Sequence, residues 1–126
     1  IKATIDALGA ADDSRAKLVA CELAGGVAAV EASLAWLLEA AGSDARLPGA
    51  ASVHYLKLWG IVCGGWLLGQ SALACLAGAG EDDGFRSAKL NTAQFFALQV
   101  LSEAQSLQRK IVEGSAAVLS LDAAAF

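Results

Sequence analysis

The chain of 126 residues contains no methionine, a single histidine, His54, and a single proline, Pro48. One histidine does not make a metal site, and no cysteine or carboxylate stands at a chelating helical spacing from it. The HExxH, GxSxG, P-loop and GxGxxG signatures are absent as well. We therefore predict no catalytic, cofactor-binding or metal-ligating residue in this chain. His54 is interpreted as a packed or partly hydrated side chain.

Positive charge is scarce. The chain has nine lysines and arginines and thirteen aspartates and glutamates, so the net charge is −4. The basic residues are scattered singly, apart from Arg109-Lys110. Binding to nucleic acid or to an anionic membrane surface needs clustered positive charge, so we predict neither a nucleic acid nor a membrane as a partner.

Cysteines are few and odd in number, and no CxxC occurs among Cys21, Cys63 and Cys75. Each lies in an apolar helical stretch, which favours small buried side chains in a reducing compartment and predicts a cytoplasmic protein. Cys63 and Cys75 are about 18 Å apart along one helix, too far for a disulfide. A Cys21–Cys63 pair between helices stays open.

Apolar residues are abundant, at 56% of the chain, and they recur at alternating steps of four and three residues. That spacing places them on one side of an α-helix. We therefore predict an all-α fold, an up-down antiparallel bundle of three long helices, with room for a fourth short helix at the N-terminus. The three ladders are Ala16, Ala20, Leu23, Val27, Val30, Leu34, Leu37, Ala41; Leu58, Ile61, Gly65, Leu68, Ala72, Cys75; and Leu90, Ala93, Ala97, Val100, Ala104, Leu107, Ile111, Gly114, Val118.

Capping residues suggest where these helices begin and end. The first is expected from 12–14 to about 41, with Gly42 as a left-handed C-cap, and the glycine pair 25–26 suggests a neighbour passing close by or a kink. The second is expected from 48–50 to 77, with Pro48 in its first turn and Gly78 and Gly80 after its end. The third follows the acidic run Glu81–Asp83 and extends to about 113–119.

Three segments are expected along the chain. Residues 1–11 are an entry segment or the end of a preceding helix, residues 12–121 form the bundle, and residues 122–126 are a tail that frays unless Phe126 docks. Because the chain opens on Ile1 and has no methionine, we expect a piece of a longer protein.

The second helix is apolar on almost every side. Between Leu58 and Gly80 only Gln70 and Ser71 are polar, and the run is long enough to span a membrane. The two polar residues sit near its centre, and no basic cluster flanks it. We interpret it as a central helix buried by protein, with the flanking helices long enough to cover it, and keep a membrane span as the alternative.

Aromatic residues concentrate on the same helix. Tyr55, Trp59 and Trp66 share one face by the four-three rule. Core packing is the ordinary explanation of such a stripe. The alternative is docking on a larger body outside this chain, so the three residues are our candidate interface.

Several motifs resemble those of one enzyme family. The runs 55–60 (YLKLWG) and 65–68 (GWLL) resemble the YLxLxG…GW pattern in the C-terminal extension of a subgroup of acyl-CoA dehydrogenases. Residues 85–96 (FRSAKLNTAQFF) are similar to the AKxxTAxFF/Y helix of that extension, and residues 113–119 (EGSAAVL) to its close. The subgroup includes enzymes that act on acetyl-like or 3-methylmercaptopropionyl-CoA thioesters. The resemblance spans nearly the whole chain.

The resemblance implies a parent enzyme of fatty acid metabolism. That enzyme oxidises an acyl-CoA substrate at Cα–Cβ, passing a hydride to FAD while a glutamate removes the α-proton. Both the flavin site and the glutamate belong to the preceding dehydrogenase core, so the resemblance carries no catalytic residue over and predicts no cofactor in this fragment. It implies an accessory bundle packed on the core of the same polypeptide or at a subunit contact of a homo-oligomer.

One residue departs from the family pattern. Ser102 stands where the family often has proline after two apolar residues, so the third helix need not bend there, and its geometry at this point stays open. Two other functions stay open, a stand-alone interaction or scaffold bundle and a small membrane-associated protein.

Overall fold

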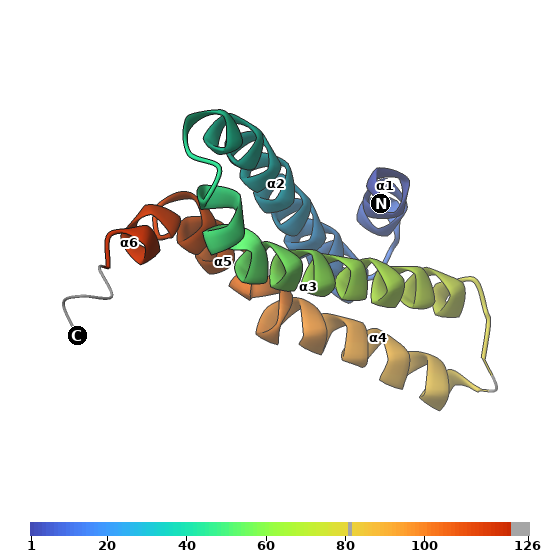
Figure 1. Ribbon diagram of the computed structural model, residues 1–126. Coiled ribbons are helices and arrows are strands. Elements are labelled where there is room, and N and C mark those ends of the chain that lie inside the picture. Colours follow the sequence, from blue (N-terminus) through green and yellow to red (C-terminus); the bar gives the residue numbers. More distant parts are fainter. Residues whose placement is uncertain (81, 122–126) are drawn as a thin grey trace.

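The computed structural model describes residues 1–80 and 82–121, and all regular structure within them is helical (Figure 1). The expectations for Glu81 and for residues 122–126 fall outside these ranges. The all-α class is confirmed, and a short helix does lie at the N-terminus. The elements are α1 (Lys2–Ala10), α2 (Ser14–Ser43), α3 (Leu47–Leu76), α4 (Asp83–Gln99), the 3₁₀ turn η1 (Leu101–Glu103), α5 (Ala104–Val112) and α6 (Ser115–Leu119).

The first long helix, α2, begins as predicted but ends differently. Asp13 is its N-cap, with a carboxylate oxygen that accepts from the backbone N–H of Arg15 at 2.8 Å and of Ala16 at 3.2 Å. The prediction that Gly42 is a left-handed C-cap is wrong, because α2 continues through it to Ser43. The extended Asp44 ends the helix instead, and its N–H donates to the carbonyl of Ala40.

The second long helix, α3, matches its predicted bounds closely. Pro48 lies in its first turn, and the helix ends at Leu76. Gly78 (φ +92°) and Gly80 (φ +115°) follow it, and among the described residues only these two have positive φ. The left-handed conformation that glycine permits therefore ends this helix rather than α2.

Helix α3 is the centre of the fold, since it contacts α1, α2, α4, α5 and α6. Glycines form notches in its surface that let side chains of the neighbouring helices approach the backbone. A Cβ atom added to these glycines would come within 3.0 Å of the inserted side chain in each case. The pairs are Gly64 with Phe96, Gly65 with Leu101, and Gly69 with Leu8.

The prediction of one continuous third helix is wrong, and the bend that the sequence left open at Ser102 is present. Helix α4 ends at Gln99, and η1 separates it from α5. The Ser102 hydroxyl donates to the carbonyl of Leu98 at 2.7 Å, and a serine bonded to the carbonyl four residues earlier often bends a helix. As a result Leu101, which is not a predicted rung, points into the core and is 1% exposed, while the predicted rung Val100 is half-buried against the same core cluster.

The helices do not form a regular up-down bundle in Figure 1. Helix α4 runs back beside α3, while α2 is inclined to α3, and α5 and α6 lie near the N-terminal end of α3. The up-down arrangement is therefore not confirmed. The close neighbour predicted for the pair 25–26 is present, because Gly26 faces both Val62 and Leu101.

The flanking helices cover α3 only in part. Within the apolar run its outward side exposes Trp59, Leu67 and Leu76, so the neighbouring helices alone do not cover it, and its complete burial by protein stays a prediction. Both α2 and α3 are long and apolar enough to cross a membrane by length and composition alone, and the sequence had singled out only α3. Core helices of soluble proteins share these properties, and the lack of a membrane partner stays a prediction.

The three cysteines differ in environment, and in the structure all are free thiols. Cys75 is buried and Cys63 half-buried, close to the prediction. The prediction is wrong for Cys21, which is exposed because it lies one residue past the buried Ala20, on the outward side of α2. The reducing compartment stays a prediction.

Candidate functional site

Two of the three predicted interface residues meet on the surface of α3. The rings of Tyr55 and Trp59 pack edge to face, with centroids 6.5 Å apart and planes at 82°. Tyr55 is half-buried, and Trp59 is 38% exposed. Both come from the N-terminal half of α3, one helical turn apart, which explains why they lie side by side.

These two aromatic residues form one wall of an apolar groove between α2 and α3. Its larger part is a cavity of about 550 Å³, and a smaller cavity of about 200 Å³ adjoins it at Trp59. Apart from the hydroxyls of Ser52 and Tyr55 and a carboxylate at the edge, Glu31, the side chains that line both cavities are apolar. The larger cavity is lined by Leu37, Leu38, Ala41, Pro48, Ser52, Tyr55, Leu56 and Trp59, and the smaller by Ile1, Val27, Val30, Glu31, Leu34, Trp59 and Val62.

The third predicted residue, Trp66, lies beneath α1. Its indole N–H donates to the hydroxyl of Thr4 at 3.0 Å, and its ring is half-buried. Trp66 therefore contributes to the contact between α1 and α3, while Tyr55 and Trp59 remain in the open groove. Their role in an interface with another body stays a prediction.

The α2 side of the groove was not singled out as a site from the sequence. The apolar ladder predicts that Leu34 and Leu37 are core residues. Leu34 is nevertheless 43% exposed, and Leu38, which is outside the ladder, is 70% exposed. The regular spacing of apolar residues on α2 does predict an apolar face at this position. What covers that face depends on where α1 begins, and the start of α1 reaches α2 at about Glu31.

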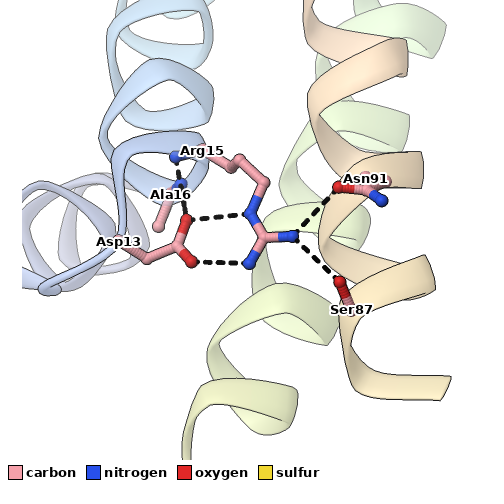
Figure 2. A network of polar contacts seen from close by, with 5 residues as sticks. All are labelled: Asp13, Arg15, Ala16, Ser87 and Asn91. Carbon is pink, nitrogen blue, oxygen red and sulfur yellow. Dashed lines mark hydrogen bonds and ion pairs between the residues drawn. The ribbon is translucent and has the colours of Figure 1, made fainter. Parts of the chain in front are cut away.

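A polar network joins the start of α2 to α4 (Figure 2). The guanidinium of Arg15 donates to both carboxylate oxygens of Asp13, at 3.2 and 2.7 Å, and to Ser87 and Asn91 on α4, at 3.3 and 2.9 Å. The donors of Arg15 are thus directed at groups of the protein itself. This arrangement connects α2 to α4 and leaves few N–H donors of Arg15 free to bind an anionic ligand.

Within this network the pKa of the Asp13 carboxyl group is strongly lowered. The hydrogen bond from Arg15 is the largest cause, and the backbone N–H groups of Arg15 and Ala16 add to it. Together they lower the pKa of Asp13 from 3.8 to about 2. The carboxylate therefore stays ionised at neutral pH and acts as helix cap and ion-pair partner, not as a proton donor.

Polar residues elsewhere do not form a catalytic set. An open, shallow cavity on α5 is lined by Ser102, Gln105, Ser106, Arg109, Lys110, Glu113 and Gly114. There Arg109 pairs with Glu113 at 3.3 Å. Among the described residues no group of three or more His, Cys, Asp or Glu side chains could hold a metal ion. His54 is half-buried near the start of α3.

The described residues do not fit a flavin site on their own. A flavin dinucleotide needs a deep pocket with polar anchors and partners for its pyrophosphate. Within residues 1–80 and 82–121 the buried polar side chains are Ser33 and Ser115, and no lysine or arginine is buried. The Ser115 hydroxyl already donates to the carbonyl of Ile111 at 2.7 Å, within its own helical turn.

Comparison with known proteins gives two matches. Residues 1–122 match the family described as acetyl-CoA dehydrogenase C-terminal like. A 3-methylmercaptopropionyl-CoA dehydrogenase from Ruegeria pomeroyi (strain ATCC 700808 / DSM 15171 / DSS-3) is 40% identical over 107 residues. That alignment covers 83% of this chain and 18% of the relative, in its C-terminal part. The chain thus spans less than a fifth of the length of this relative.

Proposed function

Because the chain belongs to the acetyl-CoA dehydrogenase C-terminal like family, we propose that it is the C-terminal accessory domain of a FAD-dependent acyl-CoA dehydrogenase. The parent enzyme oxidises the Cα–Cβ bond of an acyl-CoA thioester. The observation that carries this proposal is the family match over residues 1–122, together with the C-terminal position of the matching segment in the dehydrogenase relative.

The domain acts by packing and not by chemistry. Its buried interior is made almost entirely of apolar side chains, and its polar network connects α2 to α4. The open groove beside Tyr55 and Trp59 offers an apolar surface for the dehydrogenase core of the same polypeptide or for a subunit contact in a homo-oligomer. The parent enzyme holds FAD in its core and works in the cytoplasm.

The full-length gene product tests this proposal. We expect the purified parent to show flavin absorbance and to reduce an electron acceptor when an acyl-CoA is added. The domain alone, expressed from residue 1, should be folded and helical by circular dichroism, colourless and inactive. A parent without a dehydrogenase core, or a domain that binds flavin by itself, would contradict the proposal. A parent with no dehydrogenase core would favour a stand-alone interaction domain.

A further inference from the structure

The groove between α2 and α3 is filled over one part of its length and open over the rest. In the filled part, α1 inserts Leu8, which is fully buried against Gly69 of α3 and clusters with Val19 of α2. The open part begins at Trp59 and includes Leu38 and the other residues of the larger cavity. One short helix therefore covers only part of a surface that is apolar throughout.

The direction of α1 leads from the open part to the filled part. At its start, Lys2 pairs with Glu31 of α2 at 3.0 Å, and near its end Leu8 clusters with Val19, twelve residues earlier on α2. The start of α1 therefore lies toward the C-terminal half of α2 and its end toward the N-terminal half, while Figure 1 shows α1 at a steep angle to α3. Ile1 itself lines the smaller cavity together with Leu34 and Trp59. A polypeptide that enters at Ile1 passes this end of the groove.

The length of the relative shows how much polypeptide lies outside this chain. The alignment covers 18% of the dehydrogenase relative and falls in its C-terminal part, so a long segment precedes the matching region there. If the proposed function holds, a similar segment leads into Ile1 in the parent of this chain. The end of that segment, which joins Ile1, therefore lies beside the open groove.

We propose that the residues immediately before Ile1 in the parent enzyme turn at Ile1 and fill the open part of the groove as a helix of their own. Pro48 and Trp59, at the two ends of the larger cavity, are eleven residues apart on α3, or about 16 Å, so about eleven helical residues are needed. Because the lining is apolar, the entering helix presents apolar side chains at a spacing of three and four residues. This inference rests on the proposed function, since it takes its occupant from the parent polypeptide.

Disulfide mapping in the full-length parent tests the proposal. Cys21, Cys63 and Cys75 are first replaced by serine or alanine, and Leu56→Cys is combined with one cysteine at each of the eleven positions before Ile1. We expect rapid oxidation to an intramolecular disulfide at two or three positions spaced three or four residues apart. Leu67→Cys is the matched control, because it is exposed on the same helix but outside the groove, and we expect no disulfide with it.

Hydrogen exchange gives a second measurement that needs no substitution. In the unmodified parent, the backbone amides of the eleven residues should exchange as slowly as those of α1. No disulfide with Leu56→Cys, disulfides spread evenly along the segment, or fast amide exchange would each overturn the proposal. Disulfides that form only between two molecules would overturn it in favour of a second copy of the chain. Flavin absorbance and dehydrogenase activity of the unmodified parent report on the proposed function separately.

Discussion

Leu101→Ala is expected to destabilise the domain more than any ordinary surface substitution. Leu101 is 1% exposed, and its side chain lies between the notches at Gly26 and Gly65. The change removes three buried carbon atoms, a transfer loss of about 2.4 kcal/mol. A cavity of roughly 60 Å³ adds about 1.5 kcal/mol, because glycine walls have no side chain that could move into the space. We expect a loss of about 4 kcal/mol.

Urea unfolding of the isolated domain, followed by circular dichroism, measures this loss. Leu98→Ala is the control, since Leu98 lies one turn earlier and is 45% exposed, and we expect it to cost less than about 1 kcal/mol. Equal losses for the two variants would refute the central position assigned to Leu101. A much smaller slope in urea for Leu101→Ala would show instead that the variant no longer unfolds in two states.

A second substitution sharpens the test of this contact. A Cβ atom at Gly65 would lie 3.0 Å from a terminal carbon of Leu101, so Gly65→Ala is expected to destabilise the unmodified domain. In the Leu101→Ala background that obstruction is gone, and the remaining neighbour, Leu23, is at an ordinary 3.6 Å. There the alanine should stabilise the helix by about 1 kcal/mol. The same sign in both backgrounds would contradict the packing described here.

Three further predictions concern single sites. Ser33→Ala should raise the free energy of unfolding by about 1 kcal/mol, because the buried Ser33 hydroxyl has no hydrogen-bond partner in the structure. The melting temperature should rise by a few degrees, and a lower melting temperature would contradict this prediction. Gly60→Ala should stabilise α3 by up to about 1 kcal/mol, since nothing lies within 4 Å of the added methyl group; a loss in urea unfolding would mean that a neighbour lies closer than described. Asp13→Asn keeps the helix cap but loses the ion pair with Arg15, at a cost of about 1–2 kcal/mol at pH 7. Because the pKa of Asp13 is lowered from 3.8 to about 2, its stabilisation is present above pH 4 and disappears as the pH falls to 2. The difference in unfolding free energy between Asp13→Asn and the unmodified domain should therefore shrink over that interval, and a constant difference would show that the ion pair is not its source.

The helical ladders predicted most of the core, because a fixed spacing of apolar residues determines which side of a helix is buried. Leu58, Ala72, Leu90 and Ile111 are all buried as expected. The main error was to omit Leu101, which is fully buried, while the predicted Val100 is only half-buried against the core. The local signal was the serine at 102, whose hydroxyl can bond to a carbonyl of the preceding turn, but spacing alone does not show whether it does so.

The groove could be predicted only in part. The sequence identified Tyr55 and Trp59 as an apolar face with an uncertain partner, and the structure places them beside the exposed part of α2. The sequence alone could not distinguish Tyr55 and Trp59 from Trp66, because all three residues share one face of the helix. What distinguishes them is the start of α1, which covers Trp66 at Thr4 and leaves Trp59 in the open groove. That boundary depends on a different segment of the chain, so the pattern of α3 contains no information about it.

The distribution of buried residues along α2 connects the fold to the proposed docking. Before Val30 the apolar ladder is buried or half-buried by α1, α3, α4 and α5, whereas after it Leu34 and Leu38 are exposed. The end of α2 that faces the open groove therefore has less apolar burial to hold it than the beginning, and such regions open locally at lower free energy than the core. A helix that fills the groove would bury Leu34, Leu38 and Trp59 and stabilise this end most. Docking of the parent polypeptide should therefore be measurable as slower amide exchange in residues 34–43 than in the isolated domain, with little change in residues 16–30.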